Sequence, residues 1–554
     1  MPKLVIDGRE VEFEDGMTVL EVARTAGIEI PTLCFREGCR PETSCLVCVV
    51  RINAGRTLRP SCATMAVDGM VVDSETEEIK AARRMALELL LGDHLGDCVG
   101  PCQTICPAHM DIPAMIRLIS AGRMDEAVAK VKERIPIPAV LGRICPELCE
   151  KGCRRKDVDS PVAIRLLKRW VGDYDLAQSV PYRPECRPSS GRRVAIIGAG
   201  PTGLSAAYYL ARDGHCCVVL DEGQAPGGKL RDGVSRQALP GQVLQGEIDT
   251  ILQLGIELRP GTRVGRDVAL ERLCEEFDAV VVATGETHLN EGHLLGMPFE
   301  QDRLVVDKVT HMTPTPGLFV ASSALKPSRH AVRAVAAGAA VARSASVYLG
   351  ARADREPERP YTVRMGKLQG DELARFAEGS PAYDRITPSG GEQAGFAPQE
   401  AQAEAERCLH CDCAGLADCR LRHWAMRYQA SPTRYREGQG QFERITTHPD
   451  VIYEPGKCIA CGLCVQITQA AGADLGLTFI GRGFDVRVGV PFDEAMSAGL
   501  GEVARQCVEA CPTGALVMRP GAGEAPKPAG APSPAPGEAD DSSRHNSESR
   551  DRLT

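Results

Sequence analysis

The chain has 554 residues, of which 43% are hydrophobic and 4% aromatic, and its formal net charge is −9. A chain of this length is expected to form several domains rather than one core. The negative charge gives no reason to expect a nucleic-acid partner. No stretch reaches the roughly 18 consecutive apolar residues of a membrane span, and the first residues lack the apolar core of a signal peptide. We therefore expect a cytoplasmic protein without a membrane span.

The 24 cysteines lie mainly in four groups, within residues 34–62, 98–153, 408–419 and 458–511. Because thiols stay reduced in the cytoplasm, dense cysteine there predicts bound metal rather than disulfides. Thiolates at such spacings are typical ligands of iron–sulfur clusters. A glycine-rich dinucleotide fingerprint lies between the second and third groups, so the pattern predicts an electron-transfer protein.

Residues 1–75 have the pattern of a small mixed α/β unit, in which Thr18 opens an amphipathic helix. Four thiolates follow the helix and could hold one cluster. Cys39 is a rival to Cys34 that spacing alone does not exclude, and we favour Cys34. The predicted ligands are Cys34, Cys45, Cys48 and Cys62.

Three stretches in this region carry a resemblance: Ile30-Pro-Thr-Leu-Cys34, Ser44-Cys-Leu-Val-Cys-Val49 and Asp68-Gly-Met70. They are similar to the 2Fe–2S ferredoxin domain of the large subunit of NADH dehydrogenase and of iron-only hydrogenases. The resemblance implies a β-grasp domain with one 2Fe–2S cluster. A zinc knuckle is the alternative interpretation.

Residues 76–185 are predicted to be helical, with cysteines in the breaks between helices. Six thiolates there suit more than one cluster. The stretches Cys106-Pro-Ala-His-Met-Asp-Ile-Pro113 and Gly142-Arg-Ile-Cys-Pro-Glu-Leu-Cys-Glu150 resemble the N-terminal domain of the glutamate synthase small subunit. Dihydropyrimidine dehydrogenase has a similar domain, and these domains carry two 4Fe–4S clusters.

The resemblance implies interleaved ligands, with Cys98, Cys102 and Cys153 in one cluster and Cys106, Cys145 and Cys149 in the other. Where the family has a further cysteine, this chain has His94 in the pattern His94-x3-Cys98. A histidine ligand would raise the potential of its cluster, and an exposed histidine at a helix end is the alternative. The family's fourth ligand of the second cluster corresponds to Lys168, which is not a usual iron ligand.

The fingerprint glycines Gly198, Gly200 and Gly203 follow an apolar strand and precede a helix, as a dinucleotide site requires. Asp221 ends the next strand and could accept hydrogen bonds from ribose hydroxyls. Two further motifs stand at FAD-domain positions of the same glutamate synthase family, which implies bound FAD. These motifs are Pro226-Gly227-Gly228 and Val280-Val-Val-Ala-Thr284-Gly285.

That family, like thioredoxin reductase, inserts a second nucleotide domain for NAD(P)H after this last motif. Here only residues 286–316 separate Gly285 from Gly317-Leu-Phe-Val-Ala321, fewer than the roughly 50 residues of a small domain. We therefore expect the nicotinamide domain to be missing. Ser322-Ser323 replaces the family's closing Gly-Asp, so a fold that has lost its FAD is the alternative.

The last two groups of cysteines lie beyond a polar connector. The first offers four thiolates that suit a 4Fe–4S cluster or, alternatively, zinc: Cys408, Cys411, Cys413 and Cys419. The second begins like a bacterial ferredoxin and resembles the large subunit of NADH dehydrogenase, which implies one 4Fe–4S cluster. Its predicted ligands are Cys458, Cys461, Cys464 and Cys511, with Cys507 as a spare.

The predicted fold class is multidomain α/β and α+β. The expected segments are a β-grasp ferredoxin at 1–75, a helical double 4Fe–4S domain at 76–185, a Rossmann-like FAD domain at 191–350, a connector at 351–400, a C-terminal iron–sulfur domain at 401–518 and a disordered tail at 519–554. The expected cofactors are FAD, one 2Fe–2S cluster and three to four 4Fe–4S clusters, one of them replaceable by zinc.

These modules favour an FAD-dependent iron–sulfur oxidoreductase subunit without a catalytic side chain of its own, because the cofactors carry the chemistry. Its expected partner is a redox subunit like those of molybdopterin dehydrogenases, hydrogenases or NAD(P)H oxidoreductases, and a ferredoxin is a second candidate partner. One alternative is an electron relay with a vestigial flavin site. Another is an NAD(P)H-dependent enzyme whose nicotinamide site lies on a different subunit.

Overall fold

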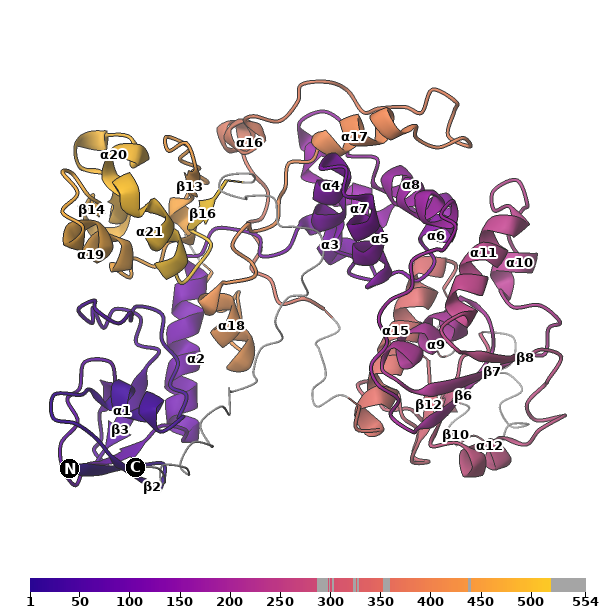
Figure 1. Ribbon diagram of the computed structural model, residues 1–554, viewed down its shortest axis with the longest axis horizontal. Coiled ribbons are helices and arrows are strands. Elements are labelled where there is room, and N and C mark those ends of the chain that lie inside the picture. Colours follow the sequence, from indigo (N-terminus) through magenta and orange to yellow (C-terminus); the bar gives the residue numbers. More distant parts are fainter. Residues whose placement is uncertain are drawn as a thin grey trace, which may run out of the picture.

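The computed structural model describes residues 1–285, 297, 299–300, 303–321, 325, 328–351, 359–436 and 440–519. Ser322-Ser323 and nearly all of the predicted tail at 519–554 lie outside the described residues. Figure 1 shows the first and last domains on one side of the molecule and the helical and nucleotide domains on the other. No described helix has both the length and the apolar composition needed to cross a bilayer.

The N-terminal domain is a five-stranded sheet in the order β2-β1-β5-β3-β4, with β1 and β5 parallel. Thr18 caps α1 as predicted: its hydroxyl accepts the Glu21 N–H (3.3 Å), and the Glu21 carboxylate accepts the Thr18 N–H (2.7 Å). The elements are β1 (Lys3–Ile6), β2 (Arg9–Glu12), α1 (Val19–Thr25), β3 (Val49–Ile52), β4 (Leu58–Pro60) and β5 (Val71–Asp73).

A helical region follows, in which short helices alternate with cysteine-bearing breaks. Helix α2 runs from the N-terminal domain toward the C-terminal domain (Figure 1). Helices α6 and α8 pack so closely that a Cβ on Gly142 would lie 2.3 Å from the Arg169 Cα. The elements are α2 (Glu77–Gly92), α3 (Pro101–Ile105), α4 (Ile112–Ser120), α5 (Met124–Lys132), α6 (Pro138–Ile144), α7 (Leu148–Lys151), η1 (Arg154–Asp157) and α8 (Ile164–Leu176).

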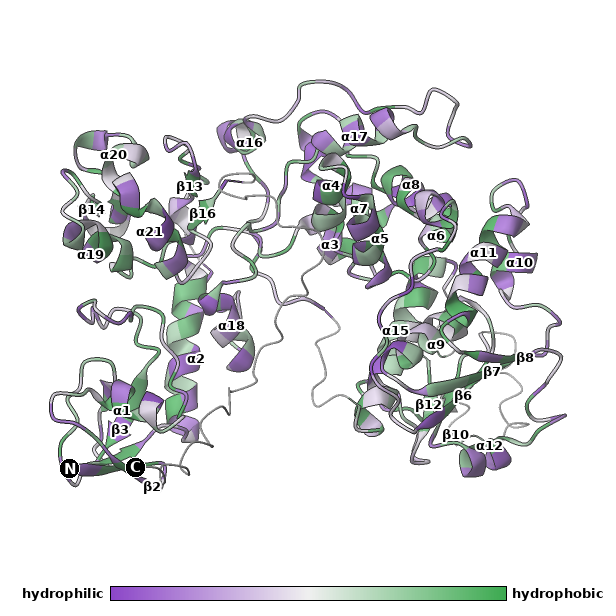
Figure 2. Cartoon of the chain, viewed as in Figure 1, coloured by the Kyte–Doolittle hydropathy of each residue, from purple (hydrophilic) through white to green (hydrophobic). Residues whose placement is uncertain are grey.

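The nucleotide domain has a five-stranded parallel sheet in the order β12-β9-β6-β7-β8. Its strands are largely hydrophobic (Figure 2), as expected where helices cover a parallel sheet. The elements are β6 (Arg193–Ile197), α9 (Pro201–Arg212), β7 (Cys216–Leu220), α10 (Lys229–Asp232), α11 (Gly241–Leu252), β8 (Glu257–Arg259), α12 (Leu270–Glu276), β9 (Ala279–Val282), β10 (Phe299–Glu300), β11 (Arg303–Leu304), β12 (Leu318–Val320) and α15 (Ala331–Tyr348).

The C-terminal region contains the last cysteines and is built from short helices, two antiparallel strand pairs (β13 with β16 and β14 with β15) and one isolated bridge between Ile445 and Tyr453. Its elements are α16 (Gly370–Ala377), α17 (Pro398–Glu406), α18 (Arg420–Arg427), β13 (Val451–Tyr453), η3 (Pro455–Lys457), α19 (Leu463–Ala470), β14 (Thr478–Ile480), η4 (Gly483–Asp485), β15 (Arg487–Gly489), η5 (Pro491–Asp493), α20 (Met496–Leu500), η6 (Gly501–Val503), α21 (Ala504–Ala510) and β16 (Leu516–Met518).

Helix α17 differs from its predicted place. The predicted boundary at residue 400 falls inside this helix, which packs against α4 and α8 of the helical region (Figure 1). The buried carboxylate of Glu404 accepts the Ala163 N–H at the start of α8 (2.7 Å). The chain therefore returns to the helical region before it enters the C-terminal domain.

Candidate metal centres and flavin site

The first cysteine group, which we call site I (Cys34, Cys45, Cys48 and Cys62), forms two close sulfur pairs. The Sγ atoms of Cys34 and Cys45 lie 3.2 Å apart, and those of Cys48 and Cys62 lie 3.4 Å apart. Two sulfurs on one tetrahedral metal at about 2.3 Å would be separated by a similar distance, roughly 3.8 Å. The hydrogen bond from Cys45 lowers the pKa of Cys34 to about 6, and that from Cys62 lowers the pKa of Cys48 to about 7. Site I therefore fits a two-iron cluster with one pair on each iron.

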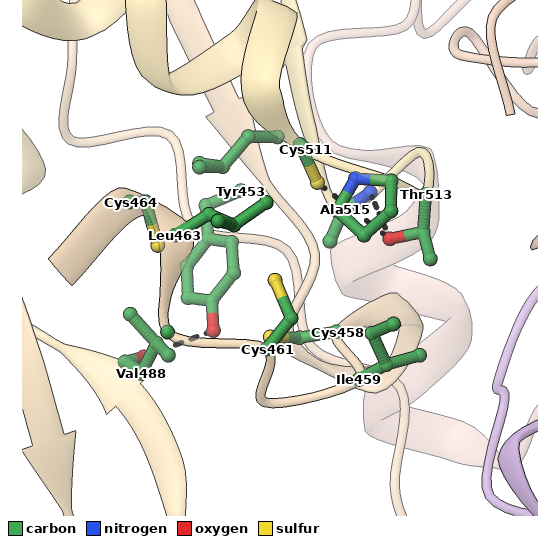
Figure 3. Close-up of a pocket in the computed structure, with 13 residues that line it drawn as sticks. Tyr453, Cys458, Ile459, Cys461, Leu463, Cys464, Val488, Cys511, Thr513 and Ala515 are labelled. Atoms are coloured by element: carbon green, nitrogen blue, oxygen red, sulfur yellow. Dashed lines mark hydrogen bonds between the residues drawn. The ribbon is translucent and has the colours of Figure 1, made fainter. Parts of the chain in front are cut away.

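Site II consists of Cys458, Cys461, Cys464 and Cys511, which line one pocket (Figure 3). Three of them come from the loop before α19 and from its first turn, and Cys511 follows α21. Burial raises the pKa of Cys461 to about 12, so this thiol stays protonated until a metal displaces its proton. Cys507 is fully buried, and its thiol points to the Cys464 carbonyl oxygen (3.9 Å). Burial and this contact give Cys507 a role in the packing around site II.

Site III joins His94 and Cys98 to two cysteines more than 300 residues further along the chain, Cys413 and Cys419. Cys413 is the thiol that acts most strongly on Cys98, and the Cys413 N–H donates to the Cys98 carbonyl oxygen (3.2 Å). The charge of Cys419 interacts with both Cys413 and Cys98. These contacts bring together thiols from the two ends of residues 98–413, a segment that contains most of the helical region and the nucleotide domain.

His94 lies at the edge of site III beside Lys457. A Cβ on Gly96 would lie 2.8 Å from the Lys457 Cε and 3.6 Å from the His94 Nε2, and the Lys457 Nζ donates to the Cys413 Sγ (3.7 Å). The interpretation of His94 as an exposed histidine is wrong, because it is only 7% exposed. Burial, with the nearby Lys457 charge, lowers the pKa of His94 to about 4. The ring is therefore neutral at pH 7, as a metal ligand requires.

Site IV contains Cys102, Cys153, Cys408 and Cys411. The thiols acting on Cys102 include Cys408, Cys411 and Cys153, and Cys411 in turn interacts with Cys408 and Cys153. Burial raises the pKa of Cys408 to about 12. Two thiols of the helical region and two from the segment after α17 thus lie close enough for their charges to interact.

The contacts in sites III and IV differ from two of the predicted ligand sets. The thiols that act on Cys98 include Cys413, whereas those that act on Cys102 include Cys153, Cys408 and Cys411. The predicted sets, Cys98 with Cys102 and Cys153 and the four cysteines of residues 408–419 together, thus stand beside a divided arrangement. Within the described residues, no three His, Cys, Asp or Glu side chains are spaced to hold a single metal ion.

Site V contains the three remaining thiols of the helical region, Cys106, Cys145 and Cys149. They interact with one another, and the charge of Lys168 acts on Cys106 and Cys149. Lys168 projects from α8 and is 4% exposed. The structure thus places this lysine beside the predicted second cluster of the helical region.

The five sites follow one another in a single series. The charge of Cys34 in site I interacts with Cys461 in site II. The charge of Cys511 in site II interacts with Cys419 in site III. Sites III and IV share a short stretch of chain, in which one residue separates Cys411 from Cys413. Site IV meets site V where Cys149 acts on Cys102.

Site V lies at the end of this series that is nearest to the nucleotide domain. Helix α6, whose C-cap is Cys145, packs against α11 and α15. Glu247 on α11 accepts the N–H groups of Ala139 and Val140 at the start of α6 (2.8 Å each). The helical region is therefore anchored to the nucleotide domain through the first turn of the helix whose other end leads to Cys145 of site V.

The glycine fingerprint has the geometry of a dinucleotide-binding turn. Gly198 has φ +109°, and a Cβ on Gly203 would lie 1.8 Å from the Gly198 carbonyl oxygen, so neither position accepts a side chain. A Cβ on Gly200, by contrast, would meet no atom within 4 Å. Gly228 approaches Gly200 so closely that its own Cβ would lie 3.1 Å from the Gly200 Cα. The open side of Gly200 is where a pyrophosphate would approach.

The polar groups around this turn fit a bound nucleotide. The Asp221 carboxylate accepts the N–H groups of Ala199 (2.5 Å) and Gly223 (2.7 Å), and each oxygen keeps a further lone pair for a ribose hydroxyl. The Gly227 N–H donates to the Ala199 carbonyl oxygen (2.9 Å). The hydroxyl oxygen of Thr284, beside Gly285, is buried without a hydrogen-bond partner among the described residues. A buried orphan of this kind is explained by an absent ligand.

Three family models match separate parts of the chain. Residues 3–77 match a 2Fe-2S iron-sulfur cluster binding domain, and residues 95–180 match dihydropyrimidine dehydrogenase domain II, 4Fe-4S cluster. Residues 196–255 match an NAD(P)-binding Rossmann-like domain. The chain therefore carries 2Fe–2S and 4Fe–4S domains and a Rossmann-like domain, which confirms the predicted fold class and resemblances.

The relatives are named as oxidoreductase subunits. The beta subunit of an NADPH-Fe(3+) oxidoreductase of Geobacter sulfurreducens is 43% identical over 188 residues, which cover 33% of this chain and 28% of the relative. The beta subunit of an NADP(+)-dependent formate dehydrogenase of Moorella thermoacetica is 42% identical over 206 residues, covering 33% and 29%. The PreT subunit of an NAD-dependent dihydropyrimidine dehydrogenase of Escherichia coli is 36% identical over 188 residues, covering 33% and 45%.

The similarity thus spans less than half the length of these three relatives. Among solved structures, an NAD+-reducing [NiFe]-hydrogenase aligns over 95% of this chain and 90% of its own, with 13% identity and a TM-score of 0.34.

Proposed function

We propose that the chain is an iron–sulfur flavoprotein oxidoreductase subunit, which exchanges electron pairs at FAD and passes single electrons along five clusters. Site I would hold a 2Fe–2S cluster through its four cysteines, and sites II to V would hold 4Fe–4S clusters. The proposed ligands are the residues of each site defined above, with His94 as the one histidine. FAD would supply the two-electron chemistry, and the iron–sulfur clusters would supply one-electron steps.

The observation that carries the proposal is the unbroken series of thiol groups. Each site has a charge interaction with the next or is joined to it by a single intervening residue. A protein that used its cysteines only for structural zinc would gain nothing from such a series. The series begins beside the nucleotide domain at site V and ends in the N-terminal domain at site I.

The nucleotide domain supports a role without its own nicotinamide site. Strand β9 pairs directly with β12, and the described part of the connection contains only the two-residue strands β10 and β11. We infer that the nicotinamide domain is missing and that a partner subunit or a ferredoxin exchanges electrons with this chain. The relatives' names as beta subunits of larger oxidoreductases support such a partner, and bound clusters suit a cytoplasmic location.

The test is anaerobic purification followed by quantification of iron, acid-labile sulfide and FAD. We expect the iron and sulfide of one 2Fe–2S and four 4Fe–4S clusters together with one FAD per chain. Colourless protein that holds only zinc would contradict the proposal. Addition of NADPH and of NADH in separate titrations should leave the flavin oxidised, and prompt bleaching by either would contradict the missing nicotinamide domain.

A second candidate is an electron relay whose flavin site is empty. It is favoured by the sequence at Ser322-Ser323, which lies outside the described residues, and opposed by the buried Thr284 hydroxyl and the open face of Gly200. Acid extraction of the purified protein distinguishes the two. Release of FAD supports the flavoprotein, whereas full cluster content without flavin supports the relay.

A further inference from the structure

Lys168 is a buried cation without a carboxylate partner. It is 4% exposed, and within the described residues it makes no ion pair and no side-chain hydrogen bond. The other two lysines that are buried among the described residues behave differently: Lys132 is paired with Asp175, and Lys457 is paired with Glu454. The fold thus neutralises two of its buried ammonium groups with carboxylates and leaves the third to another anion.

The groups around Lys168 identify that anion. Lys168 lies on α8, which packs against α6, whose C-cap is Cys145, and against α7, which contains Cys149. Its charge also acts on Cys106 and Cys149. Taking an unpaired ammonium out of water costs several kcal/mol. Protonated thiols would not offset this cost, whereas thiolates bound to an iron–sulfur cluster carry a net negative charge. A cluster at site V would supply the negative charge that no carboxylate of the described residues supplies to Lys168.

We propose that Lys168 is the built-in counter-charge of the cluster at site V and raises the reduction potential of that cluster. It is a positioning residue and not an iron ligand. On reduction the cluster gains one electron from the donor, which loses one, and no bond to Lys168 forms or breaks. The added negative charge is stabilised by the fixed ammonium through a low-dielectric interior, where charge interactions are strong.

This inference rests on the proposed function and adds a direction to it. Site V is the site nearest to the nucleotide domain, since α6 packs on α11 and Glu247 holds its first turn. A raised potential there makes site V the first station to accept an electron from a reduced flavin. The remaining sites then receive electrons from an already filled neighbour.

Three variants test the role of Lys168 in the full-length, cluster-loaded protein. Lys168→Met removes the charge, Lys168→Arg keeps it, and Lys151→Met removes an exposed charge from the neighbouring helix α7 as a matched control. The measurement is a dithionite titration followed by electron paramagnetic resonance. For Lys168→Met we expect one 4Fe–4S signal to become harder to reduce by about tenfold or more in its equilibrium constant, which corresponds to about 59 mV for a one-electron couple.

The other outcomes are also decisive. Lys168→Arg should keep the potential close to the original, and Lys151→Met should leave all signals in place. If Lys168→Arg behaved like Lys168→Met, or if Lys168→Met shifted no signal, the inference would be overturned although the clusters were present. If the unmodified protein contained no iron and no sulfide, the proposed function itself would fail, so the two failures are distinguishable. Iron content measured in each variant separates a shifted potential from a lost cluster.

Discussion

The side chain of Arg407 ties the segment that carries Cys408 and Cys411 to the helical region. Arg407 is fully buried and donates to the carboxylates of Glu404 (2.9 Å) and Asp159 (2.8 Å) and to the carbonyl oxygens of Ser160 (2.8 Å) and Tyr383 (3.1 Å). Arg407→Met keeps much of the side chain's volume and removes all four hydrogen bonds. It leaves the Glu404 carboxylate buried without its cation.

The expected loss follows from these contacts. Removing one partner of a buried ion pair typically costs about 3–5 kcal/mol. Glu404 keeps two backbone N–H donors, from Ala163 and Ile386, and Asp159 keeps its pair with Arg155. We therefore expect the lower end of that range, about 3 kcal/mol. The control Arg272→Met removes an exposed pair with Glu276, for which we expect no measurable loss because surface ion pairs contribute little.

The assay uses one tryptophan as a local reporter. The chain has two tryptophans, so in a Trp424→Phe background Trp170 on α8 reports the helical region alone. Urea unfolding of the anaerobic, cluster-loaded protein, followed by the Trp170 fluorescence, gives the free energy of unfolding of that region. Because a multidomain chain can unfold in steps, only the transition seen by Trp170 is compared. A loss below about 1 kcal/mol for Arg407→Met would refute the role given to this buried network.

Three further predictions concern the cofactor sites and the domain contact. Gly203→Ala should disrupt the turn, because its Cβ would lie 1.8 Å from the Gly198 carbonyl oxygen. Gly200→Ala should fold normally and lose FAD, because its Cβ would occupy the open space where the pyrophosphate would approach. Thermal melting measures the stability of each variant, and acid extraction measures its flavin content. Cys34→Ser should abolish the 2Fe–2S resonance signal and Cys39→Ser should leave it unchanged, because the Cys34 sulfur lies 3.2 Å from a second thiol. Burial raises the pKa of Glu247 to about 8 from an ordinary value of 4.5, so the folded state holds this proton more tightly than the unfolded state. The free energy of unfolding should therefore fall as the pH rises from about 4.5 to 8, and Glu247→Gln should reduce that slope in denaturation measured across the pH range.

The sequence predicted what local spacing encodes. The cap at Thr18 and the strand, glycine turn and helix of the nucleotide domain depend on residues close together in the chain, and the structure shows both. Cys34, Cys45, Cys48 and Cys62 likewise lie in one short segment, where they form two close sulfur pairs, and their role as ligands of one cluster stays a prediction. Such short patterns reflect the geometry of one helix, strand or turn and the spacing of its apolar residues, both of which can be read from a single sequence.

Sites III and IV could not be predicted in this way because their halves are separated by the helical and nucleotide domains. The spacing from Cys408 to Cys419 looks like a complete ligand set, and only the folded chain shows that Cys413 meets Cys98. One signal was present in the sequence: His94 stands where the family has a cysteine, so the ligand pattern around Cys98 departs from that of the family. The burial of Lys168 likewise depends on packing between α6 and α8, which no local pattern reveals.

The junctions between sites differ in what holds them together. At the junction of sites III and IV, Cys411 and Cys413 are separated by one residue, so their Cα atoms lie within about 7 Å of each other whatever the packing. The intervening Asp412 is fixed by two hydrogen bonds from Arg117 (2.9 and 2.7 Å). Covalent geometry therefore guarantees this junction in any folded form of the chain.

The junction of sites I and II has no such covalent constraint. There the side chain of Gln466 on α19 accepts the Arg40 N–H (2.7 Å) and donates to the Arg40 carbonyl oxygen (3.0 Å) and to Glu42 (3.0 Å). Arg83 on α2 adds a hydrogen bond to the Val49 carbonyl oxygen (3.0 Å) and so holds the N-terminal domain against its helix. Since exposed hydrogen bonds contribute little net stability, packing between the two domains and not covalent geometry must keep site I beside site II.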